Sequence, residues 1–330
     1  MKTTFLLGAG FNVDAMAESP PIYGHSIYIG EFQIECLYPM LSDLPRICFE
    51  VATLDQPVEE LLAQAQSDGK WKPLERLART IMHADYYLGQ ELTKDGAQNS
   101  YSKFFDHFPN AQFLTFNYDS LVERFLYCRQ RWYPDDGYGL PVVTNQPRRT
   151  ADHPASTSCV LHLHGAFCLY ESDHQFIDRT GSGTSWYEEI DPPQYQFDPH
   201  SIAALFFPYR GIGPTSGYEP VERRVIAPVP NKSDGLRARF VRRMYQQAEA
   251  LLEASGVAIA IGYAFGAADE ASYAPLLKAL ERSTERRLLI VDPQAKSIAN
   301  RIANAANRLS IVPIAETFGG WARNQFAMGE

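Results

Sequence analysis

The chain has 330 residues, of which 45% are hydrophobic and 21% charged, and its formal net charge at pH 7 is -9. This composition is typical of a soluble globular protein, and the length is enough for one large domain with insertions. The acidic charge disfavours broad non-specific binding to nucleic acid. No run of about 18 apolar residues can span a bilayer and we find no secretory signal, so we expect no membrane segment and a cytoplasmic location.

The cysteines disfavour a common class of zinc site. Their number is odd and none forms a Cys-x-x-Cys pair, whereas four-thiolate zinc sites bring their ligands together in close pairs. Several lie in apolar runs, so we expect reduced core thiols and no zinc. The positions are Cys36, Cys48, Cys128, Cys159 and Cys168.

The chain begins with an apolar run, Thr3–Leu7, that predicts a strand and leads directly into a turn containing Gly8 and Gly10. Backbone amides in such a turn can approach a phosphate closely. The turn lacks the third glycine of Gly-x-Gly-x-x-Gly, so the common dehydrogenase fingerprint is not met. A plain strand-to-helix turn is the alternative.

Between residues 20 and 107 the apolar residues recur mostly at helical spacing. The predicted helices are Val58–Ala65, Pro73–Met82 and Tyr101–Phe105. We interpret residues 20–107 as a mostly helical insertion that covers the sheet.

Polar groups follow the next apolar run, at the point where a helical pattern begins. Residues 112–116 predict a buried strand, Asn117 and Asp119 come directly after it, and a helix is predicted from Ser120. Ligands of open parallel sheets bind at the carboxyl ends of the strands. Alternatively, Asp119 caps the helix and Asn117 forms the turn.

A second apolar strand, predicted from Cys159, ends in His164 and Gly165. The alternation of a strand places Val160, His162 and His164 on one face, so at least one imidazole is expected at the sheet edge, facing Asn117. The two histidines could instead be metal ligands, although no third ligand lies nearby in sequence.

Residues 170–224 are rich in glycine, proline and aromatic residues, with weak periodicity. The stretch is long for a structureless connection, so we interpret it as a lid or an oligomer contact. Arginines and lysines between residues 223 and 243 lead into a helix predicted over residues 235–254. We interpret them as a solvated helix face rather than a nucleic-acid site.

The last third alternates strands and helices. Strands are predicted over Val257–Ile261, Leu288–Val291 and Ser310–Ile314, with helices over residues 269–281 and 293–306. This pattern predicts an α/β fold with a Rossmann-like parallel sheet. Gly262 and Asp292 directly follow two of these strands.

Five short motifs together resemble sirtuin-like proteins, in the same chain order, and in particular the zinc-free prokaryotic sirtuin-like NAD hydrolases of antiphage defence. The resemblance covers nearly the whole chain, so we expect residues 1–330 to form a single sirtuin-like domain. The motifs are Gly8-Ala9-Gly10, Thr115-Phe116-Asn117-Tyr118-Asp119, Leu163-His164-Gly165, Ile261-Gly262-Tyr263-Ala264-Phe265 and Ile290-Val291-Asp292.

The resemblance implies that NAD is the substrate and that nicotinamide and ADP-ribose are the products. By the same resemblance, Asn117 positions the nicotinamide ribose or the attacking water, His164 is the base, and Asp119 contacts the carboxamide. Histidine suits that role because its pKa lies near neutral pH. The other residues expected to bind the dinucleotide are Gly8, Ala9, Gly10, Asn12, Gly262, Tyr263 and Asp292.

Two positions depart from the family pattern, and a third bears on the choice between NAD and NADP. Asn12 stands where a serine is common in the family, and Ala264 replaces the serine of the usual Gly-Tyr-Ser turn, so one hydroxyl contact to NAD is missing. Asp292 ends a strand where a carboxylate can accept hydrogen bonds from the adenosine ribose, which favours NAD over NADP. Alternatively, Asp292 only caps the following helix.

Two other functions remain open at this stage. Family deacylases carry a four-cysteine zinc module after the catalytic histidine, whereas residues 170–224 contain no cysteine. A catalytically idle NAD-binding module is expected to lose Asn117 or His164, and both are present. We also expect a homo-oligomer and a partner protein that activates the site.

Overall fold

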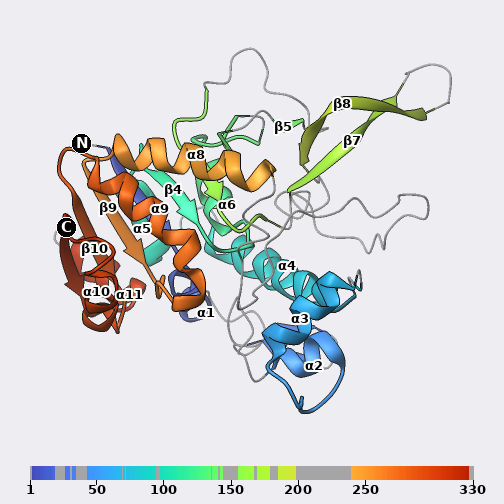
Figure 1. The fold of residues 1–330 in the computed structure, drawn as a ribbon, viewed down its shortest axis with the longest axis horizontal. Coiled ribbons are helices and arrows are strands. Elements are labelled where there is room, and N and C mark those ends of the chain that lie inside the picture. The colour runs from blue at the N-terminus through green and yellow to red at the C-terminus, as the bar shows by residue number, and fades with distance from the viewer. Residues whose placement is uncertain are drawn as a thin grey trace.

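A six-stranded sheet forms the centre of the molecule (Figure 1). Its neighbouring strands are all parallel, in the order β11-β10-β9-β1-β4-β6. The strands are β1 (Thr3–Leu7), β4 (Gln112–Thr115), β6 (Val160–His162), β9 (Val257–Ile261), β10 (Arg287–Val291) and β11 (Ser310–Ile314). Counted along the chain this order is 6-5-4-1-2-3, the Rossmann arrangement, so the predicted fold class is confirmed.

The computed structural model describes most of the chain with gaps between the ranges. The described residues are 2–18, 27–29, 32–34, 43–68, 70, 72–93, 97–134, 136–139, 142–143, 155–166, 169–178, 185–197 and 239–326.

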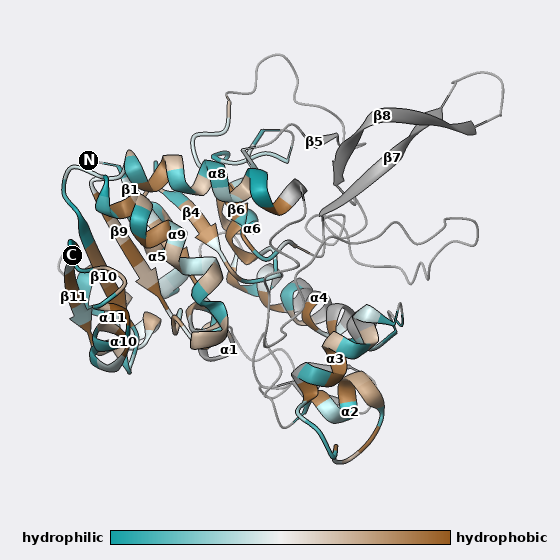
Figure 2. Cartoon of the chain, in the orientation of Figure 1, coloured by the Kyte–Doolittle hydropathy of each residue, from teal (hydrophilic) through white to brown (hydrophobic). Residues whose placement is uncertain are grey.

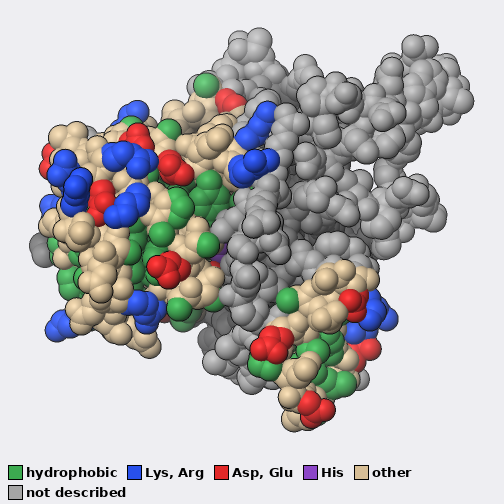
Figure 3. Space-filling view, viewed as in Figure 1, with side chains coloured by type: hydrophobic (Ala, Val, Ile, Leu, Met, Phe, Trp, Pro, Cys, Tyr) green, Lys and Arg blue, Asp and Glu red, His purple; other side chains and the backbone are tan. Residues whose placement is uncertain are grey.

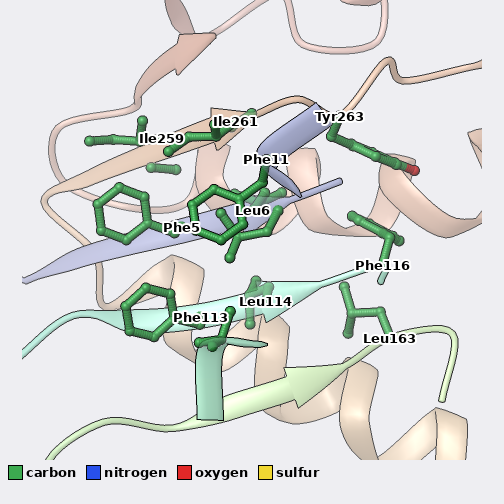
Figure 4. Close-up of a cluster of buried hydrophobic side chains, with 14 of the residues drawn as sticks. Phe5, Leu6, Phe11, Phe113, Leu114, Phe116, Leu163, Ile259, Ile261 and Tyr263 are labelled. Carbon is green, nitrogen blue, oxygen red and sulfur yellow. The ribbon is translucent and has the colours of Figure 1, made fainter. Parts of the chain in front are cut away.

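The central strands are largely apolar because helices cover both faces of the sheet. In β1, residues Thr4 to Leu7 are buried, and all five residues of β9 are buried. Phe5 lies opposite Phe113 of β4 and Ile259 of β9 in the parallel register. Figure 2 shows these strands as predominantly hydrophobic, and Figure 4 shows their side chains packed together.

Aromatic contacts attach three helices to one face. These are α5 (Ser100–His107), α6 (Leu121–Cys128) and α11 (Phe318–Phe326). The Phe104 ring centroid lies 4.8 Å from that of Phe5 and 5.4 Å from that of Phe318, and Phe105 stacks on Phe125 at 4.8 Å. The α5 helix begins where the Asn99 side chain accepts the Ser102 N–H at 2.8 Å.

Two long helices, α8 (Arg239–Glu253) and α9 (Glu270–Glu281), pack together on the opposite face (Figure 1). Arg282 joins them by ion pairs to Glu249 and Glu253. Basic side chains are visible along this surface in Figure 3, and Arg242 and Arg243 of α8 are exposed. These two agree with the predicted solvated helix face. The short helix α10 (Ala295–Ile302) connects β10 to β11.

The predicted helical insertion covers the sheet only in part. Its helices before α5 are α2 (Leu44–Phe49), α3 (Val58–Ser67) and α4 (Lys72–Leu92). Leu88 and Leu92 of α4 join the main core, whereas Leu77 and Ile81 of the same helix join a separate cluster with α2 and α3. The helix α4 therefore connects the sheet to a second, smaller core (Figure 1).

Part of the segment with weak periodicity is regular structure. Strands β7 (Leu169–Asp178) and β8 (Ser185–Phe197) pair antiparallel, and β5 (Val142–Val143) joins β8. The strand signal is obscured because β8 contains Pro192 and Pro193 and the register shifts near Ser172. Residues 198–224 of the predicted lid or interface lie outside the described residues. The strands β2 (Ile27–Ile29) and β3 (Phe32–Ile34) form a separate pair.

None of the helices in the described ranges is both long and apolar enough to cross a bilayer.

Candidate active site

The order of the strands in the sheet reverses between β1 and β9. The glycine turn that follows β1 contacts the glycine turn that follows β9. The Gly8 N–H donates to the Ile261 carbonyl and the Gly10 N–H to the Gly262 carbonyl, each at 3.0 Å. Gly262 has a φ of +60°, and a Cβ added to Gly10 would lie 2.6 Å from the Gly262 Cα. These glycines are therefore required for the close approach of the two turns.

The amide groups in the first turn are not equally available to a phosphate. Those of Gly8 and Gly10 already donate to the backbone, whereas Ala9 is exposed and its N–H has no acceptor among the described residues. Ala9 begins the 3-10 helix η1 (Ala9–Asn12). The Ala9 amide is the group in this turn that remains for a ligand.

Asn117 follows the end of β4 and is fixed at three atoms. Its N–H donates to Thr115 Oγ1 at 3.0 Å, its Nδ2 donates to the Gly8 carbonyl at 3.1 Å, and its carbonyl accepts from His162 Nδ1 at 2.9 Å. The side-chain oxygen Oδ1 has no donor within the described part of the chain. Asn117 is 5% exposed, so this oxygen is a well-oriented acceptor in a largely dry setting.

Asp119 joins the loop after β4 to the first glycine turn. Its Oδ2 accepts from Asn12 Nδ2 at 2.8 Å, and its Oδ1 accepts from the Leu121 N–H at 3.1 Å. The second contact holds the first residue of α6, whereas the N-cap position of this helix is Ser120 rather than Asp119. Asp119 thus supports the start of the helix and at the same time contacts Asn12.

The same loop is anchored to the helix α4. The Ser120 N–H and hydroxyl donate to Asp85 Oδ2 at 3.1 and 2.6 Å, and Arg124 Nε lies 3.5 Å from Asp85 Oδ1. Tyr118 packs against the smaller core formed by α2, α3 and α4. The loop from Asn117 to Ser120 is consequently held between the sheet and these helices.

His164 lies beyond the strand rather than in it, because β6 ends at His162. Gly165 has a φ of +79° and its N–H donates to the His162 carbonyl at 3.0 Å. A glycine suits this turn because other residues are strained at positive φ. His164 Nε2 lies 3.2 Å from Ser272 Oγ of α9, and the imidazole is 3% exposed.

An aromatic row connects three of the strand ends. The rings of Tyr263 and Phe116 stack with centroids 3.9 Å apart, and the Phe116 ring meets the His164 imidazole edge to face at 5.0 Å. Figure 4 shows Tyr263 and Phe116 side by side beyond the strand ends. Burial and the nearby Asp269 carboxylate raise the pKa of Tyr263 well above its ordinary value, so its hydroxyl stays neutral. Tyr263 therefore contributes an apolar ring and a neutral hydroxyl to this edge.

His162 has a different environment from His164. Its Nε2 lies 2.6 Å from Glu123 Oε1 of α6, and both side chains are fully buried. Burial works to lower the pKa of His162, but the charge of Glu123 and the hydrogen bonds of the imidazole to Glu123 and to the Asn117 carbonyl raise it above its ordinary value. Both ring nitrogens are occupied, which leaves none for a metal ion. The described residues contain no group of three His, Cys, Asp or Glu side chains placed to hold a metal.

Asp292 follows β10, beside the Gly262 turn whose N–H donates to the Val291 carbonyl at 3.0 Å. The Asp292 Oδ1 accepts from the Gln294 N–H at 2.7 Å, and the Asp292 carbonyl accepts from the Ala295 N–H at 2.9 Å. These contacts form a turn just before α10, whose N-cap is Gln294 rather than Asp292, and Asp292 remains partly exposed at the carboxyl edge.

The ten predicted site residues thus all lie at the carboxyl ends of β1, β4, β6, β9 and β10. Sequence reasoning missed Ser272 and Phe116, which contact His164, and Glu123, which contacts His162. Ser272 and Glu123 sit on helices at ordinary spacing, and only the folded packing brings them to the histidines. Phe116 had a signal, since it immediately precedes Asn117, but its apolar side chain suggested only a strand.

No family model and no curated protein matches this chain. Among solved structures it is similar to a Sir2 enzyme at 11% identity, with a TM-score of 0.40 over 99% of this chain and 90% of that chain. A mutant Sir2 homologue in complex with ADP-ribose matches at 12% identity and a TM-score of 0.40, over 99% and 90% of the two chains. Another mutant homologue, in complex with 2′-O-acetyl ADP-ribose, matches at 13% identity and a TM-score of 0.40, over 99% and 91%. At such low identity and TM-score, the function has to be inferred from this chain's own residues and their geometry.

Proposed function

We propose that this protein is an NAD hydrolase that cleaves the bond between nicotinamide and ribose, giving nicotinamide and ADP-ribose. The observation that carries the proposal is the position of Asn117 and His164 at the ends of the neighbouring strands β4 and β6. Asn117 contacts the Gly8 carbonyl at the reversal point of a Rossmann sheet, where dinucleotides bind in such folds, and His164 follows the next strand but one from β1. The five sequence motifs that resemble sirtuin-like NAD hydrolases support the same reaction.

The proposed chemistry needs few groups. The bond between the ribose C1′ and the pyridinium nitrogen breaks, its electron pair stays on that nitrogen, and nicotinamide leaves as a neutral molecule without a general acid. A water oxygen bonds to C1′ and passes its proton to His164. The Oδ1 of Asn117 would accept a hydrogen bond from that water or from a ribose hydroxyl, while one Nδ2 hydrogen donates to the Gly8 carbonyl.

The remaining positions fit the rest of the dinucleotide. The Ala9 amide would approach the pyrophosphate, Asn12 and Asp119 would lie near the carboxamide, and Tyr263 and Asp292 would contact the ribose units. The sequence resemblance further suggests NAD depletion in prokaryotic antiphage defence, in a homo-oligomer with an activating partner protein.

A regulatory NAD-binding module is the second candidate, and one observation favours it. Asn117 and His164 expose only 5% and 3% of their surface, so the site is closed in this conformation. A protein that binds NAD without turnover, or that waits for a partner to open the site, would have this arrangement.

The deciding experiment incubates the purified full-length chain with NAD and separates the products by chromatography. We expect equal amounts of nicotinamide and ADP-ribose, formed at least about a hundredfold more slowly by a His164→Ala variant purified in the same way. Bound but intact NAD, with candidate partners also tested, would favour the regulatory module. Release of nicotinamide only when an acylated peptide is added would indicate a deacylase.

A further inference from the structure

A buried pair, His162 and Glu123, contacts the main chain of Asn117. His162 Nδ1 lies 2.9 Å from the Asn117 carbonyl oxygen and His162 Nε2 lies 2.6 Å from Glu123 Oε1. The Tyr138 hydroxyl donates to the same Glu123 oxygen at 3.2 Å. All three side chains are fully buried.

The direction of the first contact follows from chemistry alone. A carbonyl oxygen accepts hydrogen bonds and cannot donate them, so His162 Nδ1 must carry a proton. This holds whether the proton between His162 and Glu123 resides on the imidazole or on the carboxyl group. In both cases the Nδ1–H donates to Asn117.

The contact completes the restraint of Asn117. Its N–H is held by Thr115 and its side-chain amide by the Gly8 carbonyl, so the His162 contact is the one that fixes the carbonyl side of the residue. These three hydrogen bonds hold the peptide groups on both sides of the Asn117 Cα. They therefore fix the direction in which the side-chain oxygen Oδ1 points.

We infer that His162 and Glu123 are positioning residues, which hold the Asn117 main chain so that its Oδ1 is aimed at the reacting ribose or water. The inference rests on the proposed function for the identity of the ligand. His162 does not itself touch the substrate, and a displacement of about 1 Å at a reacting group can reduce a rate roughly a hundredfold.

Two substitutions of His162 separate the two hydrogen bonds. An asparagine places its amide nitrogen close to the position of Nδ1, whereas a glutamine places it close to Nε2. Both are made together with Glu123→Gln, so that neither variant buries an unpaired carboxylate. His162→Asn therefore keeps the donor to Asn117, and His162→Gln loses it.

For the reaction we expect kcat of the His162→Gln variant to be roughly tenfold or more below that of the His162→Asn variant. The Kd for ADP-ribose should be similar in the two, as should Tm, because both remove the same ion pair. Ser255→Ala is the control: it removes a buried hydrogen bond to Thr4 at the opposite edge of the sheet and should leave kcat unchanged. Equal kcat in the two His162 variants would overturn the inference.

A second measurement does not depend on NAD turnover, and its first part needs only the wild-type chain. In the 15N NMR spectrum of the wild-type chain, the His162 Nδ1 should carry its proton, and the Asn117 side-chain amide should shift in the His162→Gln variant and not in the His162→Asn variant. An unprotonated Nδ1 would overturn the inference. If the wild type cleaves no NAD while these signals behave as expected, the proposed reaction fails and the positioning role stands.

Discussion

The side-chain amide of Asn12 donates to the Asp119 carboxylate at 2.8 Å and joins the loop after β1 to the loop after β4. Asn12 is 1% exposed, and its own Oδ1 has no partner within the described residues. A buried acceptor without a donor is costly, and a ligand N–H would satisfy it.

The hydrogen bond between Asn12 and Asp119 predicts which of two Asn12 variants is less stable. Asn12→Asp places a second carboxylate against Asp119, and the repulsion should cost a few kcal/mol at an intermediate dielectric. Asn12→Ala only removes the hydrogen bond and should cost about 1–3 kcal/mol. Urea unfolding at neutral pH measures both. If the two variants were equally stable, the Asp119 carboxylate would not be charged next to Asn12.

The catalytic assignment predicts a large loss of activity. His164→Ala and Asn117→Ala should each lower the rate of NAD hydrolysis by about a hundredfold or more, because each removes a group that acts on the reacting atoms. His107→Ala provides a matched control, since this histidine is exposed on α5. Initial rates and Tm are measured for all three. A variant of Asn117 or His164 that kept full activity would remove that residue from the mechanism.

Much of the sheet was predictable because its strands are short apolar runs between strong turn signals. The boundaries Thr3–Leu7, Val257–Ile261 and Ser310–Ile314 agree with the structure. The predicted strand ending at His164 is two residues too long, since Gly165 requires a turn that begins at Leu163. The alternation of side chains along a strand therefore could not predict the position of His164, which lies in the turn after the strand.

Other features depend on contacts between distant residues and could not be read from local patterns. From the sequence, His162 and His164 could both be metal ligands. Glu123 disfavours this alternative, because it lies 39 residues away in the chain and contacts the His162 Nε2. The helix predicted to end at Met82 continues to Leu92, because its second half packs against the sheet. The helix α11 was not predicted, since its glycines weaken the helical signal.

The position of Asp292 predicts cofactor choice. A 2′-phosphate within about 4 Å of this carboxylate would meet a repulsion of a few kcal/mol at an intermediate dielectric, so NAD should be preferred over NADP roughly tenfold to several-hundredfold. Asp292→Asn should reduce that preference while keeping the contact to the Gln294 N–H. Hydrolysis of both dinucleotides by both proteins is the measurement. Equal use of NAD and NADP by the wild type would leave Asp292 only its structural contact to the Gln294 N–H.

The cysteines should react in order of their accessibility. Cys128 is exposed, whereas Cys48 is buried and Cys159 partly buried. Burial raises the pKa of Cys48 to about 12, against an opposing effect of Arg76, and burial also raises the pKa of Cys159 to about 12. At pH 8 both thiols are protonated and unreactive, so among these three cysteines iodoacetamide should label Cys128 first. Peptide mass spectrometry of the folded protein gives the order, and labelling of Cys48 as fast as Cys128 would contradict it.

The buried pair of His162 and Glu123 predicts how stability depends on pH. The pKa of His162 is raised in the folded state: burial opposes protonation, but the attraction of Glu123 outweighs it. A raised pKa means that the folded protein binds this proton more tightly than the unfolded chain does. The resulting stabilisation is complete below the unfolded pKa of about 6.5 and is lost as the pH rises through the folded pKa.

Glu123→Gln isolates this contribution, because it removes the main cause of the raised pKa and leaves burial in place. We expect the wild type to exceed this variant in free energy of unfolding by the largest margin near pH 6, and the margin to shrink as the pH rises above about 6.5. Groups elsewhere in the chain titrate alike in both proteins and cancel in the difference. Urea unfolding at a series of pH values gives the margin directly. A margin that stayed constant with pH would mean that His162 is not held protonated by Glu123, although its Nδ1–H could still donate to Asn117.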